Sequence, residues 1–136
     1  EEQIKKQKNM ITYTIGDSLI RLKNACMAGQ KETVVVNTKF VVSVMEALKR
    51  IGIVRDFTKS EDNRTITDLI AYKNKEPMLM DLKLVSTPGL HIYKNRDELS
   101  KIKKATTFIL STSKGILTHK EALKMGIGGE VLVEIH

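Results

Sequence analysis

The chain has 136 residues, of which 23 are Lys or Arg and 16 are Asp or Glu, so its formal net charge is +7. This length can bury a hydrophobic core without disulfide bonds, and the excess of positive charge favours a polyanionic partner, either a nucleic acid or a membrane surface. No segment approaches the roughly 20 apolar residues of a membrane-spanning helix, and the first residues lack the apolar core of a secretory signal. We therefore expect a soluble, intracellular protein.

The first half of the chain reads as helix, strand, helix, strand, strand. Residues 1–12 are charged and show no sustained hydrophobic period, so we expect a mobile basic arm there. Apolar residues recur at helical spacing from Ile15 to Cys26, and Gly29 offers a helix end. The pattern then predicts a strand at 33–36, an amphipathic helix at 40–51 and strands at 53–59 and 65–72. We assign residues 13–76 to an amino-terminal α/β lobe.

A polar, proline-containing segment at 73–77 is the predicted boundary of that lobe or a second turn. Residues 77–136 are expected to form a carboxy-terminal, mainly β lobe with short helices. Its predicted elements are a hairpin from strands 80–85 and 90–94, a helix at 95–102, a strand at 107–110, a capped helix at 119–125 and a strand at 131–135. The predicted fold class is α/β of the α+β type, with two small lobes.

The loop predicted at 111–115 is the most informative segment, because three hydroxyl residues are followed by a lysine and a glycine. Hydroxyl groups donate hydrogen bonds to phosphate and exchange them with the 2′-hydroxyls of RNA. Lys120 and a helix N-terminus, which Thr118 and Glu121 are predicted to cap, follow closely in the sequence. We therefore expect this region to bind RNA.

Catalytic interpretations have less support. Cys26 lies in an apolar helical pattern and is expected to be buried, not a reactive thiol. A hydrolase that used Ser111 or Ser113 with His119 as base would lack the strained turn that presents a nucleophilic serine. The glycines at 126–129 follow a helix and precede a strand, which is the reverse of the order in a phosphate-binding turn.

We therefore expect no enzyme activity and no small-molecule substrate. His91, His119 and His136 lack metal-ligand spacing, so no metal or other cofactor is expected. Two alternatives to an RNA-binding structural protein stay open at this point. One is a basic RNA-processing enzyme, and the other is a protein-interaction module that uses the glycine turn.

Around the predicted loop at 111–115 and the glycines at 126–129, the chain closely resembles the bacterial-type small-subunit ribosomal protein S-eight family. The segments that together resemble the family's carboxy-terminal signature are ILSTSKGILT at 109–118, KEA at 120–122 and GIGGEVL at 126–132. The likeness extends to STPGLHIY at 86–93, GIVRDF at 52–57 and DSLIRLKNA at 17–25. It covers the chain from about residue 14 to the end and leaves the amino-terminal arm outside.

The resemblance implies a two-lobed α/β protein without catalysis that binds the central domain of small-subunit rRNA early in assembly and helps to organise the platform. Several roles in the second lobe are implied by position: Ser111, Thr112 and Ser113 contact rRNA, Lys114 and Gly115 shape the loop, Tyr93 supports or stacks at the site, Glu130 hydrogen bonds, and Gly128 and Gly129 allow close approach. A second contact is implied on the first helix, from Asp17, Arg21 and Asn24. Lys23 and Lys120 are implied phosphate partners.

The family also implies partners and a location. We expect small-subunit ribosomal proteins five and twelve as neighbours, no membrane partner, and a place in the ribosome of a bacterial cytoplasm, with an organellar ribosome as the alternative. Some members repress translation of their own mRNA, so that activity is a further expectation. Two departures stand out: Tyr13-Thr14-Ile15-Gly16 stands in place of the Asp-Pro pair that usually begins the family's first helix, and His119 stands where an aspartate is common.

Overall fold

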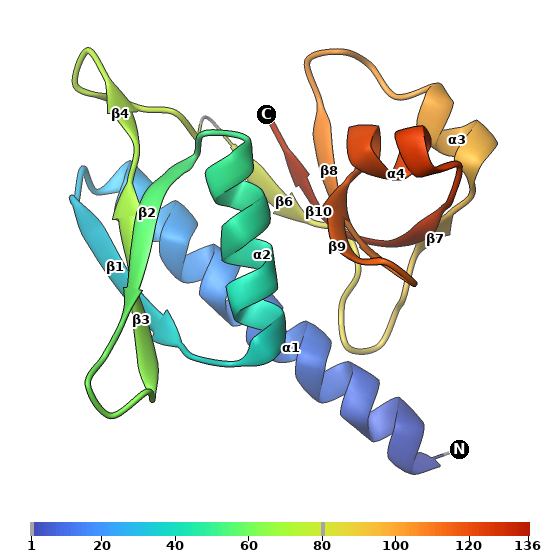
Figure 1. Cartoon of the computed structure of the whole chain (residues 1–136), viewed down its shortest axis with the longest axis horizontal. Helices are drawn as coiled ribbons and strands as arrows, with labels where there is room; N and C mark the ends of the chain where they lie inside the picture. The colour runs from blue at the N-terminus through green and yellow to red at the C-terminus, as the bar shows by residue number, and fades with distance from the viewer. Residues whose placement is uncertain (1, 80) are drawn as a thin grey trace.

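A computed structural model describes residues 2–79 and 81–136, and the side chains of residues 13–79 and 81–136. It contains two main antiparallel sheets, each covered by helices, and the chain leaves the part that holds the first sheet after residue 77 (Figure 1). We refer to residues 2–77 as the N-terminal half and to residues 81–136 as the C-terminal half. The predicted α+β fold class is confirmed.

The first helix, α1 (Glu2–Met27), is much longer than the helix predicted from Ile15. Its backbone continues through residues 2–12, the segment predicted to be an arm, and projects beyond the sheets in Figure 1. A proline in this stretch would lack the backbone amide that a helix interior needs and would stop the helix. Thr14 keeps that amide, and its carbonyl accepts a 3.0 Å bond from the Ser18 hydroxyl within the helix. The mobility of the arm stays a prediction.

The N-terminal half contains a three-stranded sheet in the order β1-β3-β2, built from β1 (Glu32–Val36), β2 (Val54–Lys59) and β3 (Thr65–Ile70). The second helix, α2 (Lys39–Arg50), begins where the Thr38 hydroxyl accepts a 3.2 Å bond from the Val41 amide. Both α1 and α2 lie on the same side of this sheet (Figure 1). The predicted strands and the second helix are confirmed, with small shifts at their ends.

The predicted boundary at 73–77 is a small hairpin of β4 (Tyr72–Lys73) and β5 (Glu76–Pro77). Asn74 and Lys75 form its turn, with φ angles of 54° and 68°. Two successive positive φ values are typical of the type I′ turn that joins closely paired strands. Its proline lies in a two-stranded ribbon, where a missing backbone donor is tolerated. The division of the chain into two domains at this point stays a prediction.

The C-terminal half contains a five-stranded sheet with β10 (Gly129–Ile135) at its centre. The other elements are β6 (Leu82–Leu84), β7 (Tyr93–Lys94), α3 (Arg96–Ser100), β8 (Thr107–Thr112), β9 (Gly115–Thr118) and α4 (His119–Met125). The strand order is β6-β10-β8-β9, and β7 also pairs with β10. Strand β9 was not predicted, because the apolar pair Ile116 and Leu117 is too short to show a period.

The hairpin predicted from 80–85 and 90–94 is wrong. Strands β6 and β7 do not pair with each other; each pairs with a different stretch of β10, at Val133–Ile135 and at Gly129–Glu130. The connection between them is fixed by the buried Ser86, whose hydroxyl accepts a 3.0 Å bond from the Ile92 amide and donates to the Val131 carbonyl. The long central strand β10 thus forms the backbone hydrogen bonds of both segments. The alternation of apolar and polar residues within each segment does not reveal which strand is its partner.

The main hydrophobic core runs through both halves. It joins residues of α1 and α2 to residues of the second sheet, among them Leu22, Leu48, Ile109 and Val133, all buried. A smaller cluster lies between the second sheet and the helices α3 and α4, around Leu99 and Leu110. The two halves therefore share apolar surface as well as the chain connection.

One polar group is buried in the N-terminal half without a partner. Asp68 on β3 is 0% exposed, and neither of its carboxylate oxygens has a hydrogen-bond partner within the described residues. Ile66 and Ile70 are buried on the same face of the strand, so the carboxyl group points toward the core under α1 and α2. Burial raises the pKa of Asp68 to about 7.

Candidate nucleic-acid interface

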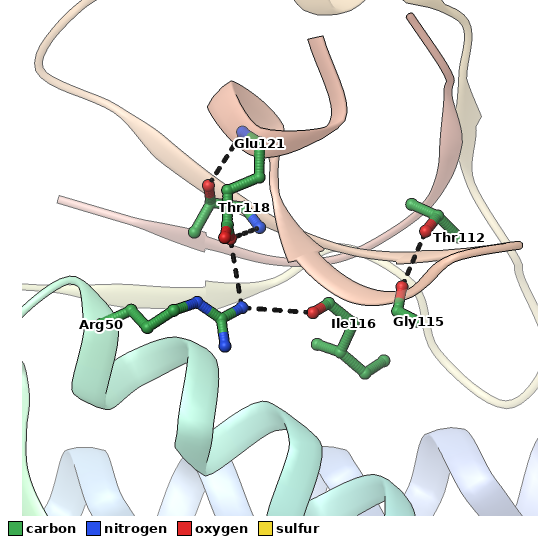
Figure 2. A network of polar contacts seen from close by, with 6 residues as sticks. All are labelled: Arg50, Thr112, Gly115, Ile116, Thr118 and Glu121. Carbon is green, nitrogen blue, oxygen red and sulfur yellow. Dashed lines mark hydrogen bonds and ion pairs between the residues drawn. The ribbon is translucent and has the colours of Figure 1, made fainter. Parts of the chain in front are cut away.

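The segment predicted as a binding loop is the tip of the hairpin between β8 and β9. Ser113 and Lys114 form the turn, while Thr112 and Gly115 are the last paired residues of the two strands. The Thr112 hydroxyl donates a 2.8 Å bond to the Gly115 carbonyl (Figure 2). It also accepts a 3.1 Å bond from the Lys114 amide. Gly115 has a φ of 104°, which a residue with a side chain rarely adopts.

This geometry separates the three hydroxyl residues into two kinds. The Thr112 hydroxyl shapes the turn, so its oxygen is already engaged. In the part of the chain that the structure describes, the hydroxyls of Ser111 and Ser113 form no hydrogen bond with the protein, and Ser113 and Lys114 are exposed at the tip. These two serines and the lysine are therefore the groups of the hairpin that can bind an external ligand.

A row of polar side chains continues from Ser111 across the sheet. Glu130 on β10 pairs directly with Ser111 on β8 and with Tyr93 on β7. Directly paired residues place their side chains on the same face of a sheet, so these three lie side by side. Tyr93 is 58% exposed, and the Glu130 carboxylate lies 2.7 Å from His91 Nδ1. The sequence analysis predicted no role for His91. This residue lies two positions before Tyr93 in an extended segment, so its side chain is expected on the same face of the sheet as the Tyr93 ring.

Gly128 and Gly129 make room for the protein's own backbone. A Cβ at Gly128 would lie 2.4 Å from the Lys94 carbonyl oxygen, and one at Gly129 would lie 2.5 Å from the Ser111 carbonyl oxygen. Both distances are far below van der Waals contact, so these positions require glycine before any ligand is considered. The close approach expected here is that of β7 and β8, and an approach by RNA stays a prediction.

His119 lies in the interior. It is 3% exposed, its Nδ1 accepts a 3.0 Å bond from the Phe108 amide, and its ring meets the Phe108 ring edge to face with centroids 6.0 Å apart. Burial and the nearby charge of Lys120 hold the pKa of His119 below its usual value, so the ring is neutral at pH 7. A buried imidazole with one nitrogen already occupied is poorly placed as the base of a serine hydrolase.

Cys26 is equally unsuited to catalysis. It is 3% exposed, and burial raises the pKa of its thiol to about 11. A thiol with that pKa is protonated at pH 7, and the thiolate is the reactive form. The prediction that Cys26 is a buried core residue is confirmed.

The fourth helix begins beside the hairpin. The Thr118 hydroxyl accepts a 3.2 Å bond from the Glu121 amide, and the Glu121 carboxylate accepts a 2.9 Å bond from the Thr118 amide. This is the predicted capping box, and it fixes where α4 starts after β9. Lys120 follows the cap and is exposed, and it lies a few residues after Ser111 and Ser113 in the sequence.

The second predicted contact surface lies on α1. Asp17 and Arg21 form an exposed ion pair of 3.0 Å, and Asn24 is exposed further along the same helix face. Lys23 has another task, since its ammonium donates a 3.2 Å bond to the Leu82 carbonyl and lies 3.4 Å from the Asp81 carboxylate. It ties α1 to β6, and a phosphate would have to compete with those contacts.

These observations define a class of protein: a basic α+β protein whose two halves present polar, cation-bearing surfaces. Within the described residues there is no group of side chains that could hold a metal ion. None of the described helices has the length and apolar character needed to cross a membrane.

Comparison with known proteins identifies the family. The family model described as Ribosomal protein S8 matches residues 13–136. A small ribosomal subunit protein uS8 from Trichodesmium erythraeum is 42% identical over 124 residues, which cover 88% of this chain and 93% of the relative. Those from Nitratiruptor and Thermosynechococcus vestitus are 35% and 41% identical over 93% and 90% of this chain, and 99% and 96% of their own. The chain therefore belongs to the ribosomal protein S8 family.

Membership confirms the predicted resemblance and with it the absence of enzyme activity, because the family consists of structural ribosomal proteins. It also agrees with the predicted location in the ribosome, since these relatives are bacterial proteins of the small subunit. The family model begins at residue 13, so the first three turns of α1 precede the matched region.

Proposed function

We propose that this protein is an RNA-binding structural component of the small ribosomal subunit that contacts the central domain of the rRNA directly and helps to assemble the platform. The observation that carries the proposal is the row of Tyr93, Glu130 and Ser111, which ends at the exposed hairpin tip. It combines an aromatic ring, an acceptor and the unbonded Ser111 hydroxyl on one face, which are groups that suit recognition of RNA by stacking and 2′-hydroxyl contacts.

Each group on this surface has a distinct part. Ser111 and Ser113 donate to phosphate oxygens or exchange bonds with 2′-hydroxyls, and Lys114 and Lys120 attract the backbone. Tyr93 offers an exposed ring on which a base can stack. Glu130, held by its contact with His91, is placed to accept hydrogen bonds from base amino groups or 2′-hydroxyls.

The surface on α1 supplies the second contact. Asp17 restrains the guanidinium of Arg21 at 3.0 Å, which keeps that cation along the helix surface. Asn24 adds an amide that can both donate and accept. Ribosomal proteins five and twelve are the neighbours proposed around these two surfaces. Repression of the protein's own mRNA would use the same RNA-binding face on a transcript that imitates the rRNA.

The test is a binding experiment with a central-domain rRNA fragment at about 0.2 M salt, where nonspecific charge attraction is weak. Replacing Ser111 and Ser113 together by Ala should weaken binding by roughly 1–3 kcal/mol without loss of folding, because RNA groups lose their partners. Ser43→Ala is the matched control, since this serine lies on α2 and donates to the Lys39 carbonyl at 3.0 Å. Equal affinity of the double variant and the control would refute the role of the hairpin.

A further inference from the structure

The last turn of α2 holds two neighbouring cations with different kinds of partner. Lys49 forms an ion pair of 3.1 Å with Asp56, so its contact stays within the N-terminal half. Arg50 forms an ion pair of 3.1 Å with Glu121, which belongs to α4 in the C-terminal half. The two pairs have equal length and similar exposure, and only the second one bridges the halves.

Arg50 reaches two structural elements with one nitrogen. Its Nη2 donates to the Glu121 carboxylate at 3.1 Å and to the Ile116 carbonyl at 3.4 Å (Figure 2). Ile116 lies on β9, one residue beyond Gly115 and hence next to the hairpin tip, and its side chain is buried in the core shared by the two halves. The guanidinium therefore contacts both the strand that carries the hairpin and the helix that follows it.

The receiving carboxylate is itself fixed in place. The same Glu121 oxygen that meets Arg50 accepts the 2.9 Å bond from the Thr118 amide in the capping box. Burial tends to raise the pKa of Glu121, but the Thr118 amide and the Arg50 guanidinium outweigh it and lower that pKa, so the group is ionised at pH 7. Arg50 is thus held by a group whose position is set by the start of α4.

We propose that Arg50 is a positioning residue for RNA binding, which through Glu121 and Ile116 holds the β8–β9 hairpin in a fixed orientation relative to α2, and hence relative to α1, with which α2 shares the main hydrophobic core. This inference rests on the proposed function, because it concerns how the two RNA-contacting surfaces act together. Two surfaces on one rigid body engage one RNA with a high effective concentration, and a loose connection reduces that gain. An exposed ion pair adds little to folding stability, so removing it should leave the protein folded. We therefore expect the loss of the Arg50–Glu121 pair to change RNA binding through the coupling of the two surfaces.

The competing explanation is that Arg50 touches RNA itself, and opposite charge changes distinguish the two. Arg50→Gln removes a cation, and Glu121→Gln removes an anion while keeping an oxygen for the Thr118 amide. If Arg50 acts through Glu121, both variants weaken binding, and the double variant is no weaker than either single one. If Arg50 binds RNA directly, Glu121→Gln does not weaken binding, because removing a negative charge favours association with RNA.

The experiment measures affinity for the central-domain rRNA fragment and hydroxyl-radical protection of that RNA. Arg21→Ala and the Ser111 and Ser113 double variant first assign the RNA positions that each surface protects. We expect Arg50→Gln and Glu121→Gln each to lower affinity about three- to tenfold, on the scale of a coupling between contacting groups, and to weaken protection by the α1 surface more than protection by the hairpin. Urea unfolding of each variant shows that the fold is kept.

Lys49→Gln is the matched control, since it removes the same charge one residue away and breaks an ion pair of the same length. We expect it to change affinity less than Arg50→Gln and to leave the protection pattern as in the wild type. The inference is overturned if Arg50→Gln matches Lys49→Gln in affinity and protection, or if Glu121→Gln leaves binding unweakened. Failure of the proposed function has a separate signature, in which the wild type binds the rRNA fragment no better than a scrambled RNA.

Discussion

The two proposed contact surfaces are built in different ways. On α1, Asp17, Arg21 and Asn24 lie along one face of a single helix, so the surface depends only on helical periodicity. In the C-terminal half, Tyr93, Ser111 and Glu130 come from three strands and meet only because β7, β10 and β8 pair in one register. The difference predicts that the helix surface survives small changes in packing, whereas the sheet surface depends on close contact between backbones.

The largest expected effect tests the contrast between the two surfaces by adding a methyl group between β8 and β10. Gly129→Ala places a Cβ 2.5 Å from the Ser111 carbonyl oxygen, so β8 and β10 must separate. We expect a loss of about 2–3 kcal/mol in the free energy of unfolding, because overpacking against backbone cannot relax through a rotamer change. Urea unfolding measures this, and RNA protection should fall at positions assigned to the hairpin while those assigned to α1 persist.

Gly89→Ala is the control for that experiment. A Cβ at Gly89 meets nothing within 4 Å, so we expect a stability change of at most about 0.5 kcal/mol. A Gly129→Ala variant as stable as Gly89→Ala would show that the strand contact is looser than described.

The N-terminal half can be tested through its buried carboxyl. Asp68→Leu replaces an unpartnered polar group in an apolar core and should stabilise the protein by about 1–3 kcal/mol at pH 8, with hairpin contacts unchanged. Because the pKa of Asp68 is raised from 3.8 to about 7, folding resists ionisation of this group. Its stabilising protonated form is fully available below about pH 4, and that contribution is lost as pH rises to about 7.

The measurement is the difference in unfolding free energy between Asp68→Leu and the wild type as a function of pH. We expect the difference to grow from pH 4 to pH 7 and then level off. A difference that stays constant over this range would mean that Asp68 finds a partner and ionises normally.

A smaller effect separates the hydroxyl that shapes the hairpin from those that bind. Thr112→Val removes the bonds to Gly115 and Lys114 and should cost about 1 kcal/mol of stability, the net worth of an ordinary hydrogen bond. The Ser111 and Ser113 double variant should leave stability unchanged, since neither hydroxyl bonds to the described protein. Thermal unfolding of both variants checks this, and a reversed order would exchange the two roles.

The smallest expected effect is electrostatic. Lys114→Ala should lower the slope of log affinity against log salt concentration by about one unit, if this exposed lysine neutralises one phosphate. The change appears only in a salt titration of RNA binding. An unaltered slope would remove Lys114 from the phosphate contacts and leave the hairpin to act through its serines.

Local signals in the sequence predicted much of this structure. The capping box of Thr118 and Glu121, the amphipathic helix that became α2 and the buried Cys26 all depend on neighbours a few residues apart. The resemblance to a family then supplied residues whose proximity no local pattern could reveal. Tyr93, Ser111 and Glu130 are far apart in the chain, and only strand pairing places them together.

The errors have the same origin. Strands β6 and β7 were predicted as partners because they are neighbours in sequence, yet the longer β10 pairs with both. For the glycines at 128 and 129, the sequence did not reveal that neighbouring backbone already requires glycine there, and the close approach of RNA to them stays a prediction. The burial of Asp68 was not predicted, because it depends on the helices that cover the sheet and not on neighbouring residues in the sequence.

The most direct test of the central claim compares the affinity of the wild-type protein for a central-domain fragment of small-subunit rRNA with that for a scrambled RNA of equal length, at about 0.2 M salt. We predict a preference of at least about a thousandfold for the rRNA fragment, as specific sites typically show over nonspecific ones. Equal, weak binding to both RNAs would contradict the account and would leave the positive charge as the sole basis of RNA affinity.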